Sequence, residues 1–149
     1  MFNEPAQLIS GILKHDRKTN SYKFALLRAI NDIVLSFLDV DPDGRDVAIP
    51  LRLIAELWFA YYFPFVDEEK PIFQGNRSAR DGTVRNDMGF RPALTAFRRQ
   101  WRALYGDNPG DGFWIINQMR RSRGKADYPA NLIDSYSQTL SAIIKAVQQ

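Results

Sequence analysis

Arginine is the residue type in this chain best suited to bind a charged ligand. Residues 76–149 carry 12 Lys and Arg against 6 Asp and Glu, whereas residues 1–75 carry 8 against 11. A planar guanidinium binds phosphate or carboxylate through two parallel hydrogen bonds. The candidate phosphate contacts lie in three segments: Arg77, Arg80, Arg85 and Arg91, then Arg98, Arg99 and Arg102, then Arg120, Arg121, Arg123 and Lys125. The alternative is a solvated surface with internal ion pairs.

Residues for metal or nucleophilic catalysis are scarce. His15 is the only histidine and there is no cysteine, which excludes zinc sites built from several His or Cys ligands and any site that needs two imidazoles. The sequence has no phosphate-binding glycine loop and no serine-hydrolase elbow. Glu56, on an otherwise apolar segment, is the best single candidate for a magnesium site, but no matching carboxylate and lysine motif accompanies it. We therefore expect no catalytic residue, no metal site and no cofactor.

Helical periodicity dominates the segments that must position these side chains. From Ser21 to Phe37, apolar residues recur every three or four positions, and Phe24, Leu27, Val34 and Leu38 form a second apolar stripe. Two apolar faces predict neighbours on two sides, so this segment is expected to be the central helix.

Five further helices are expected, and their boundaries follow from proline, glycine and the apolar period. They run from Pro5 to about Leu13, between Pro50 and Pro64, and over residues 91–106, 112–125 and 129–147. The aromatic residues between Trp58 and Phe65 are expected in the core, with a base-stacking platform as the alternative. Residues 67–92 lack a period and are expected to form an exposed basic loop. The expected fold is one all-α, compact multi-helix domain over residues 1–149, with a winged-helix-like first half as an open alternative.

Composition sets the broad class of the protein. A chain of 149 residues that is 45% hydrophobic has the size of one domain. The most apolar stretch is interrupted by Arg52 and Glu56 and ends at Pro64, so no membrane-spanning helix is expected. The first ten residues contain Glu4 and no basic residue, unlike a signal peptide. These features favour a cytoplasmic protein.

The first half of the chain resembles the N-terminal region of bacterial HNH endonuclease-like proteins, restriction-associated ones among them. The matching residues are Ser21, Tyr22, Lys23 and Phe24 at a helix start, Ile49 at the entry to the next helix, and Tyr61, Tyr62 and Pro64 at its exit. In that family, the resemblance implies, a helical section precedes the HNH nuclease domain. An HNH site needs histidines, and none follows His15. No catalytic residue is therefore carried over.

The resemblance and the basic second half together predict a non-catalytic DNA-binding or positioning module. It would contact phosphates of duplex DNA through the cations named above and serve an HNH nuclease domain in the same chain or in a partner. The first alternative is a helical protein-interaction or dimerisation module that does not bind nucleic acid. The second is a small enzyme of an unrecognised type.

Overall fold

The computed structural model describes Gln7 and residues 21–37, 46–73 and 88–149. Within residues 21–149 the described elements are α2 (Tyr22–Ser36), α3 (Leu51–Tyr62), the 3₁₀ helix η1 (Phe63–Val66), α4 (Arg91–Tyr105), α5 (Asp111–Arg121) and α6 (Ala130–Val147). These ranges contain no strand, so the all-α class is confirmed for the described residues, and no wing of a winged-helix fold lies within them. The helix expected from Pro5 to Leu13 lies outside the described residues, apart from Gln7.

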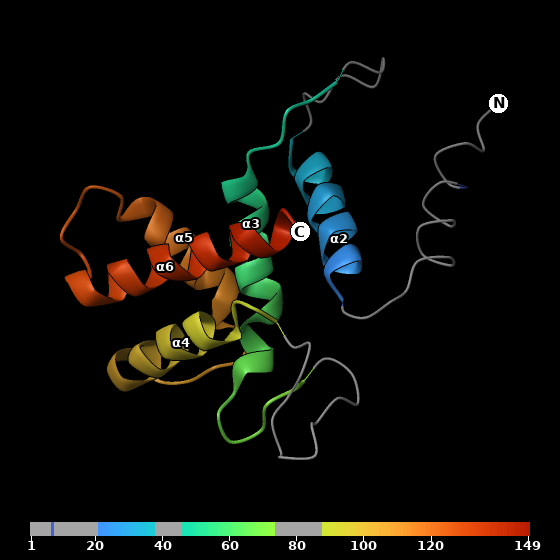
Figure 1. The fold of residues 1–149 in the computed structure, drawn as a ribbon. Helices are drawn as coiled ribbons and strands as arrows, with labels where there is room; N and C mark the ends of the chain where they lie inside the picture. The colour runs from blue at the N-terminus through green and yellow to red at the C-terminus, as the bar shows by residue number, and fades with distance from the viewer. Residues whose placement is uncertain (1–6, 8–20, 38–45, 74–87) are drawn as a thin grey trace.

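Helix α3 is the centre of the fold. It packs against α2, α5 and α6, and η1 extends it toward α4. In Figure 1, α6 crosses α3, and α2 lies on the opposite side of α3 from α4 and α5. Four aromatic residues of this segment are core residues, as expected, because Trp58, Phe59, Tyr62 and Phe63 are fully buried. Tyr61 and Phe65 are partly buried and pack against that core.

The expectation that α2 is the central helix is wrong. Helix α2 packs chiefly against α3 and buries Ala25, Ala29 and Ile33. Two of these side chains are alanines, so the contact is made by small residues that the apolar pattern did not emphasise. The second apolar stripe faces outward, since Phe24 and Val34 are exposed.

Helix α5 approaches α3 closely at a glycine. A Cβ atom built on Gly112 would lie 2.8 Å from the Cα of Ala60 and 3.1 Å from the Cβ of Phe63. The absence of a side chain at this position lets the two backbones touch. The close crossing also brings the far end of α5 to Glu56 of α3.

Candidate functional site

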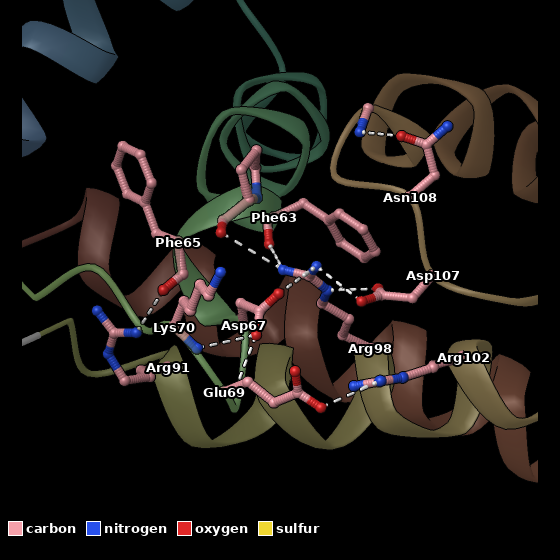
Figure 2. Close-up of polar contacts among 12 residues, drawn as sticks. Phe63, Phe65, Asp67, Glu69, Lys70, Arg91, Arg98, Arg102, Asp107 and Asn108 are labelled. Atoms are coloured by element: carbon pink, nitrogen blue, oxygen red, sulfur yellow. Dashed lines mark hydrogen bonds and ion pairs between the residues drawn. The ribbon is translucent and has the colours of Figure 1, made fainter.

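The guanidinium of Arg98 is buried and fully occupied by oxygen atoms. Its Nε and Nη2 donate to the two carboxylate oxygens of Asp107 at 2.9 and 3.2 Å, Nη2 also donates to Asp67 at 3.2 Å, and Nη1 donates to the carbonyl of Phe63 at 2.9 Å. Figure 2 shows this side chain between the two carboxylates. With its side chain only 5% exposed, Arg98 stabilises the fold, and the surface phosphate contact expected for it is replaced by this internal role.

Two of the groups that bind Arg98 lie at the C-terminal ends of helices. The Phe63 carbonyl lies where α3 passes into η1, and carbonyls at a helix end lack intrahelical partners and carry partial negative charge. Asp107 follows Gly106, whose φ of 87° ends α4. This left-handed conformation suits glycine, and it turns the chain so that Asp107 meets Arg98.

The remaining basic residues of α4 are also bonded within the protein, two of them to the acidic segment at residues 67–69. Arg99 pairs with Glu68 through a short contact, and Arg102 donates to Glu69 at 3.4 Å. The hydrogen bond from Arg99 lowers the pKa of Glu68. Arg91 donates to the carbonyls of Phe65 and Ile72 at 2.9 and 2.6 Å. The acidic segment therefore offsets much of the positive charge expected on α4.

Glu56 forms a second cluster, in which the carboxylate is buried and the arginines reach the surface. The Glu56 side chain is 4% exposed. Its Oε1 accepts a hydrogen bond from Arg52 Nε at 3.1 Å, and its Oε2 accepts one from Arg120 Nε at 2.6 Å. The Arg52 and Arg120 side chains are 47% and 42% exposed, and Arg120 also contacts Glu56 through Nη2. Both arginine side chains therefore remain partly accessible to solvent while they are paired with the buried carboxylate.

Tyr136 of α6 lies beside this cluster. Its hydroxyl is buried and has no hydrogen-bond partner among the described residues. Burial, and then the charge of Glu56, raise the pKa of the Tyr136 phenol, while Arg52, Arg120 and Arg123 act in the opposite direction. Two arginines share the single carboxylate of Glu56, and Arg123 adds positive charge near Tyr136. The local charge is positive, and α3 has no acidic residue in its first turn to reduce it.

Two more cations extend the positive charge beyond this cluster. Arg121 ends α5, and Lys125 lies in the turn that follows, where its amide donates to the Ser122 carbonyl at 2.9 Å. Both side chains are exposed, as is that of Arg123. We call Arg52, Arg120, Arg121, Arg123 and Lys125 the α5 cation surface. Cations at this helix end also interact favourably with the dipole of α5.

The structure thus separates the candidate phosphate contacts that the sequence predicted. At the end of α5, Arg120 is paired with Glu56, and Arg121, Arg123 and Lys125 are exposed. On α4, Arg91, Arg98, Arg99 and Arg102 each bond to a carboxylate or a carbonyl of the protein itself. Arg77, Arg80 and Arg85 lie outside the described residues. Sequence reasoning missed Arg52, although its spacing of four residues from Glu56 on a helix was a signal for an ion pair.

In the described ranges, no cluster of three or more His, Cys, Asp or Glu is arranged to hold a metal ion. Glu56, the candidate magnesium ligand, instead binds two arginines. No helix formed by residues 21–37, 46–73 or 88–149 has the length and apolar character required to cross a membrane.

Comparison with known proteins gives one match. A search of curated proteins and a search of solved structures each found nothing that matches. A family model described as a domain of unknown function, DUF8808, matches residues 3–149. The match spans nearly the whole chain, and the protein therefore belongs to the DUF8808 family.

Proposed function

We propose that this domain binds the phosphate backbone of nucleic acid through the α5 cation surface. The observation that supports the proposal is the imbalance of charge around Glu56. Two arginines share one buried carboxylate, and the side chains of both are nearly half exposed. On α4, by contrast, Arg99 and Arg102 are each paired with a carboxylate of their own, Glu68 and Glu69, so the charges there are matched one to one.

Phosphate binding by such a surface is sequence-independent. Each cation that neutralises a phosphate releases condensed counterions, so affinity falls as salt concentration rises. Contacts of this kind fix the position of the protein on the nucleic acid but carry little base information. We therefore expect weak, salt-sensitive binding with little preference among duplex sequences.

The test compares two double variants that remove the same charge. Arg121→Gln with Arg123→Gln changes the α5 cation surface, and Arg99→Gln with Arg102→Gln changes the cations paired with Glu68 and Glu69. Binding to labelled duplex DNA is measured by fluorescence anisotropy over a salt series. The first variant should reduce the logarithmic salt slope by up to roughly 1.8, since each lost contact accounts for about 0.9.

The second variant is the matched control and should retain most of the affinity and slope. Equal losses in both variants would show that binding follows net charge alone, which contradicts a defined surface. Absence of binding by the unmodified protein at low salt would reject the function itself. Circular dichroism of each variant checks that the helices are intact.

The resemblance to HNH endonuclease-like proteins adds a narrower hypothesis. A phosphate-binding helical module that positions DNA for a nuclease domain would use the same surface. The family match carries no assigned activity, so the nuclease partnership stays a prediction. Co-purification of the protein with products of neighbouring nuclease genes would test it.

A dimerisation module is the second candidate function, and the outer face of α2 favours it. Val34, Leu35 and Phe37 are exposed there, Leu35 at 69%. A second copy of the chain packing on this face would bury these side chains, and apolar area removed from water stabilises association. Light scattering should then show a dimer that Leu35→Lys converts to a monomer. A monomeric unmodified protein would reject this candidate.

A further inference from the structure

An aromatic surface lies at the other end of α5, outside the cation surface. Trp114 is 51% exposed and Tyr105 is 47% exposed. Both rings contact the fully buried Trp101, with centroid distances of 5.6 Å and 4.5 Å respectively. Tyr128 closes the group, 5.8 Å from Tyr105 and 6.1 Å from Trp101. We call Trp101, Tyr105, Trp114 and Tyr128 the aromatic platform.

The platform is held in place by the core. Trp101 packs against Phe97 in a stacked arrangement with a centroid distance of 6.1 Å, and the hydroxyl of Tyr128 donates to Gln118 at 3.2 Å. The outer rings of Tyr105 and Trp114 are therefore supported from behind while much of their surface meets solvent. Because these rings are already ordered in the free protein, binding a flat ligand costs less conformational entropy.

The platform and the cation surface are connected along α5. Trp114, Gln118 and Arg121 are spaced by four and three residues, which places them on one face of the helix. The seven residue steps from Trp114 to Arg121 correspond to a rise of about 10.5 Å along the helix axis at 1.5 Å per residue. This is roughly the length of three stacked nucleotides at 3.4 Å each. One strand can therefore contact both groups.

We infer that the preferred ligand is single-stranded nucleic acid, with unpaired bases stacked on Tyr105 and Trp114 and phosphates bound by Arg121 and its neighbours. This inference rests on the proposed function. Exposed aromatic rings bind bases of any sequence because every base has a π face. Bases within a duplex are stacked on each other and cannot use the platform.

The acidic residues near the aromatic platform favour the binding of bases, rather than phosphates, at the N-terminal end of α5. Asp111 lies in the first turn of α5, and Asp127 precedes Tyr128. These carboxylates repel phosphate, and the cations lie at the opposite end of the helix. The polarity of α5 thus orients a bound strand with its bases over Trp114 and its backbone at Arg121.

The experiment uses the full chain and three labelled probes of equal length, an oligothymidylate, an abasic single strand and a duplex. Oligothymidylate should bind roughly tenfold more tightly than the abasic strand, a ratio within the range of base stacking on one aromatic ring. Trp114→Ala should remove this advantage and leave abasic-strand binding unchanged. Trp114→Phe should restore most of it.

Leu104→Ala is the matched control, because Leu104 is a similarly exposed apolar residue at the same end of the molecule. It should leave the preference for bases intact. Equal affinity for the oligothymidylate and abasic strands, or a preference that survives Trp114→Ala, would overturn the inference while leaving phosphate binding standing. Failure to bind any probe at low salt would reject both proposals and point to a protein partner for the platform.

Discussion

The Arg98 cluster and the Glu56 cluster use the same residue types in opposite proportions. In the first, one buried cation is surrounded by two carboxylates and helix-end carbonyls. In the second, one buried carboxylate is shared by two partly exposed arginines. The two clusters differ in which charge is buried. Where the arginine is buried, its guanidinium is bonded to oxygens of the protein. Where the glutamate is buried, the arginines that bind it remain partly exposed and can bind a ligand.

This difference shows that the number of arginines on a helix does not by itself identify a binding surface. The number of cations on α4 suggests a binding face, but the structure matches Asp67, Glu68 and Glu69 to Arg98, Arg99 and Arg102. The end of α5 has fewer carboxylates near it. Unmatched charge, rather than total charge, identifies the candidate surface.

Replacing Arg98 should cause the largest effect on stability. Arg98→Met keeps much of the side-chain volume but leaves Asp67, Asp107 and the Phe63 carbonyl without their shared donor. Breaking a buried ion pair in this way typically costs about 3–5 kcal/mol. The free energy of unfolding is measured by urea denaturation. Arg99→Met, which affects an exposed pair, should cost far less, and similar losses for the two variants would break the comparison.

Gly112 tests how closely α5 must approach α3 to bring Arg120 to Glu56. Gly112→Ala would place a Cβ atom 2.8 Å from the Cα of Ala60. Overpacking of this kind typically costs about 1–3 kcal/mol. Gly110→Ala is the control, since its nearest contact would be 3.5 Å away, at the Asn108 side chain. A Gly112 variant as stable as the control in thermal unfolding would show that the close crossing is unnecessary.

Removing the charge of Glu56 should have a smaller effect than removing Arg98. Glu56→Gln keeps the shape of the side chain, and the partly exposed arginines can turn to water when they lose the carboxylate. We expect a loss of about 1 kcal/mol, the scale of one hydrogen bond. Urea denaturation of this variant and of Arg98→Met under the same conditions compares their losses in the free energy of unfolding. A cost at Glu56 larger than that at Arg98 would reverse the assignment of the two clusters.

The smallest expected effect is a pH dependence confined to the acidic segment. Hydrogen bonds from the amides of Lys70 and Glu69 lower the pKa of Asp67 below its ordinary value of 3.8, and Arg98 adds to this shift. The resulting stabilisation is complete above that value and is lost as pH falls through the lower pKa of the folded state. Asp67→Asn should therefore flatten the acid side of the profile of stability against pH. An unchanged slope below pH 3.8 would contradict this.

Much of the fold was predictable from the sequence, but the inward turn of Arg98 was not recognised. The apolar period located α3, α4 and α6 and identified the aromatic core. On α4, Leu94, Phe97, Arg98 and Trp101 occupy the positions i, i+3, i+4 and i+7 of a buried stripe. The pattern therefore contained the signal, but a cation at such a position is ordinarily assigned to the surface. Its partners Asp67 and Asp107 belong to other segments, and no local rule pairs them.

The aromatic platform shows a different limit of sequence reasoning. Leu104 follows Trp101 by three residues, the spacing of the buried stripe of α4, and Trp114 lies in the apolar start of α5, yet both are exposed. Burial depends on whether a neighbouring element covers a helix end, and the period of a single helix does not contain that information. For the same reason the two apolar stripes of α2 predicted neighbours on two sides, although one of the stripes faces outward.

The ion pair between Asp67 and Arg98 joins residues 31 positions apart. It therefore acts on the chain as a noncovalent cross-link that closes a loop. The entropy lost on closing a flexible loop grows only with the logarithm of its length, about 0.6 kcal/mol for each doubling. The entropic contribution of this ion pair should consequently depend little on how many residues separate Asp67 from Arg98, and mainly on whether both side chains are kept.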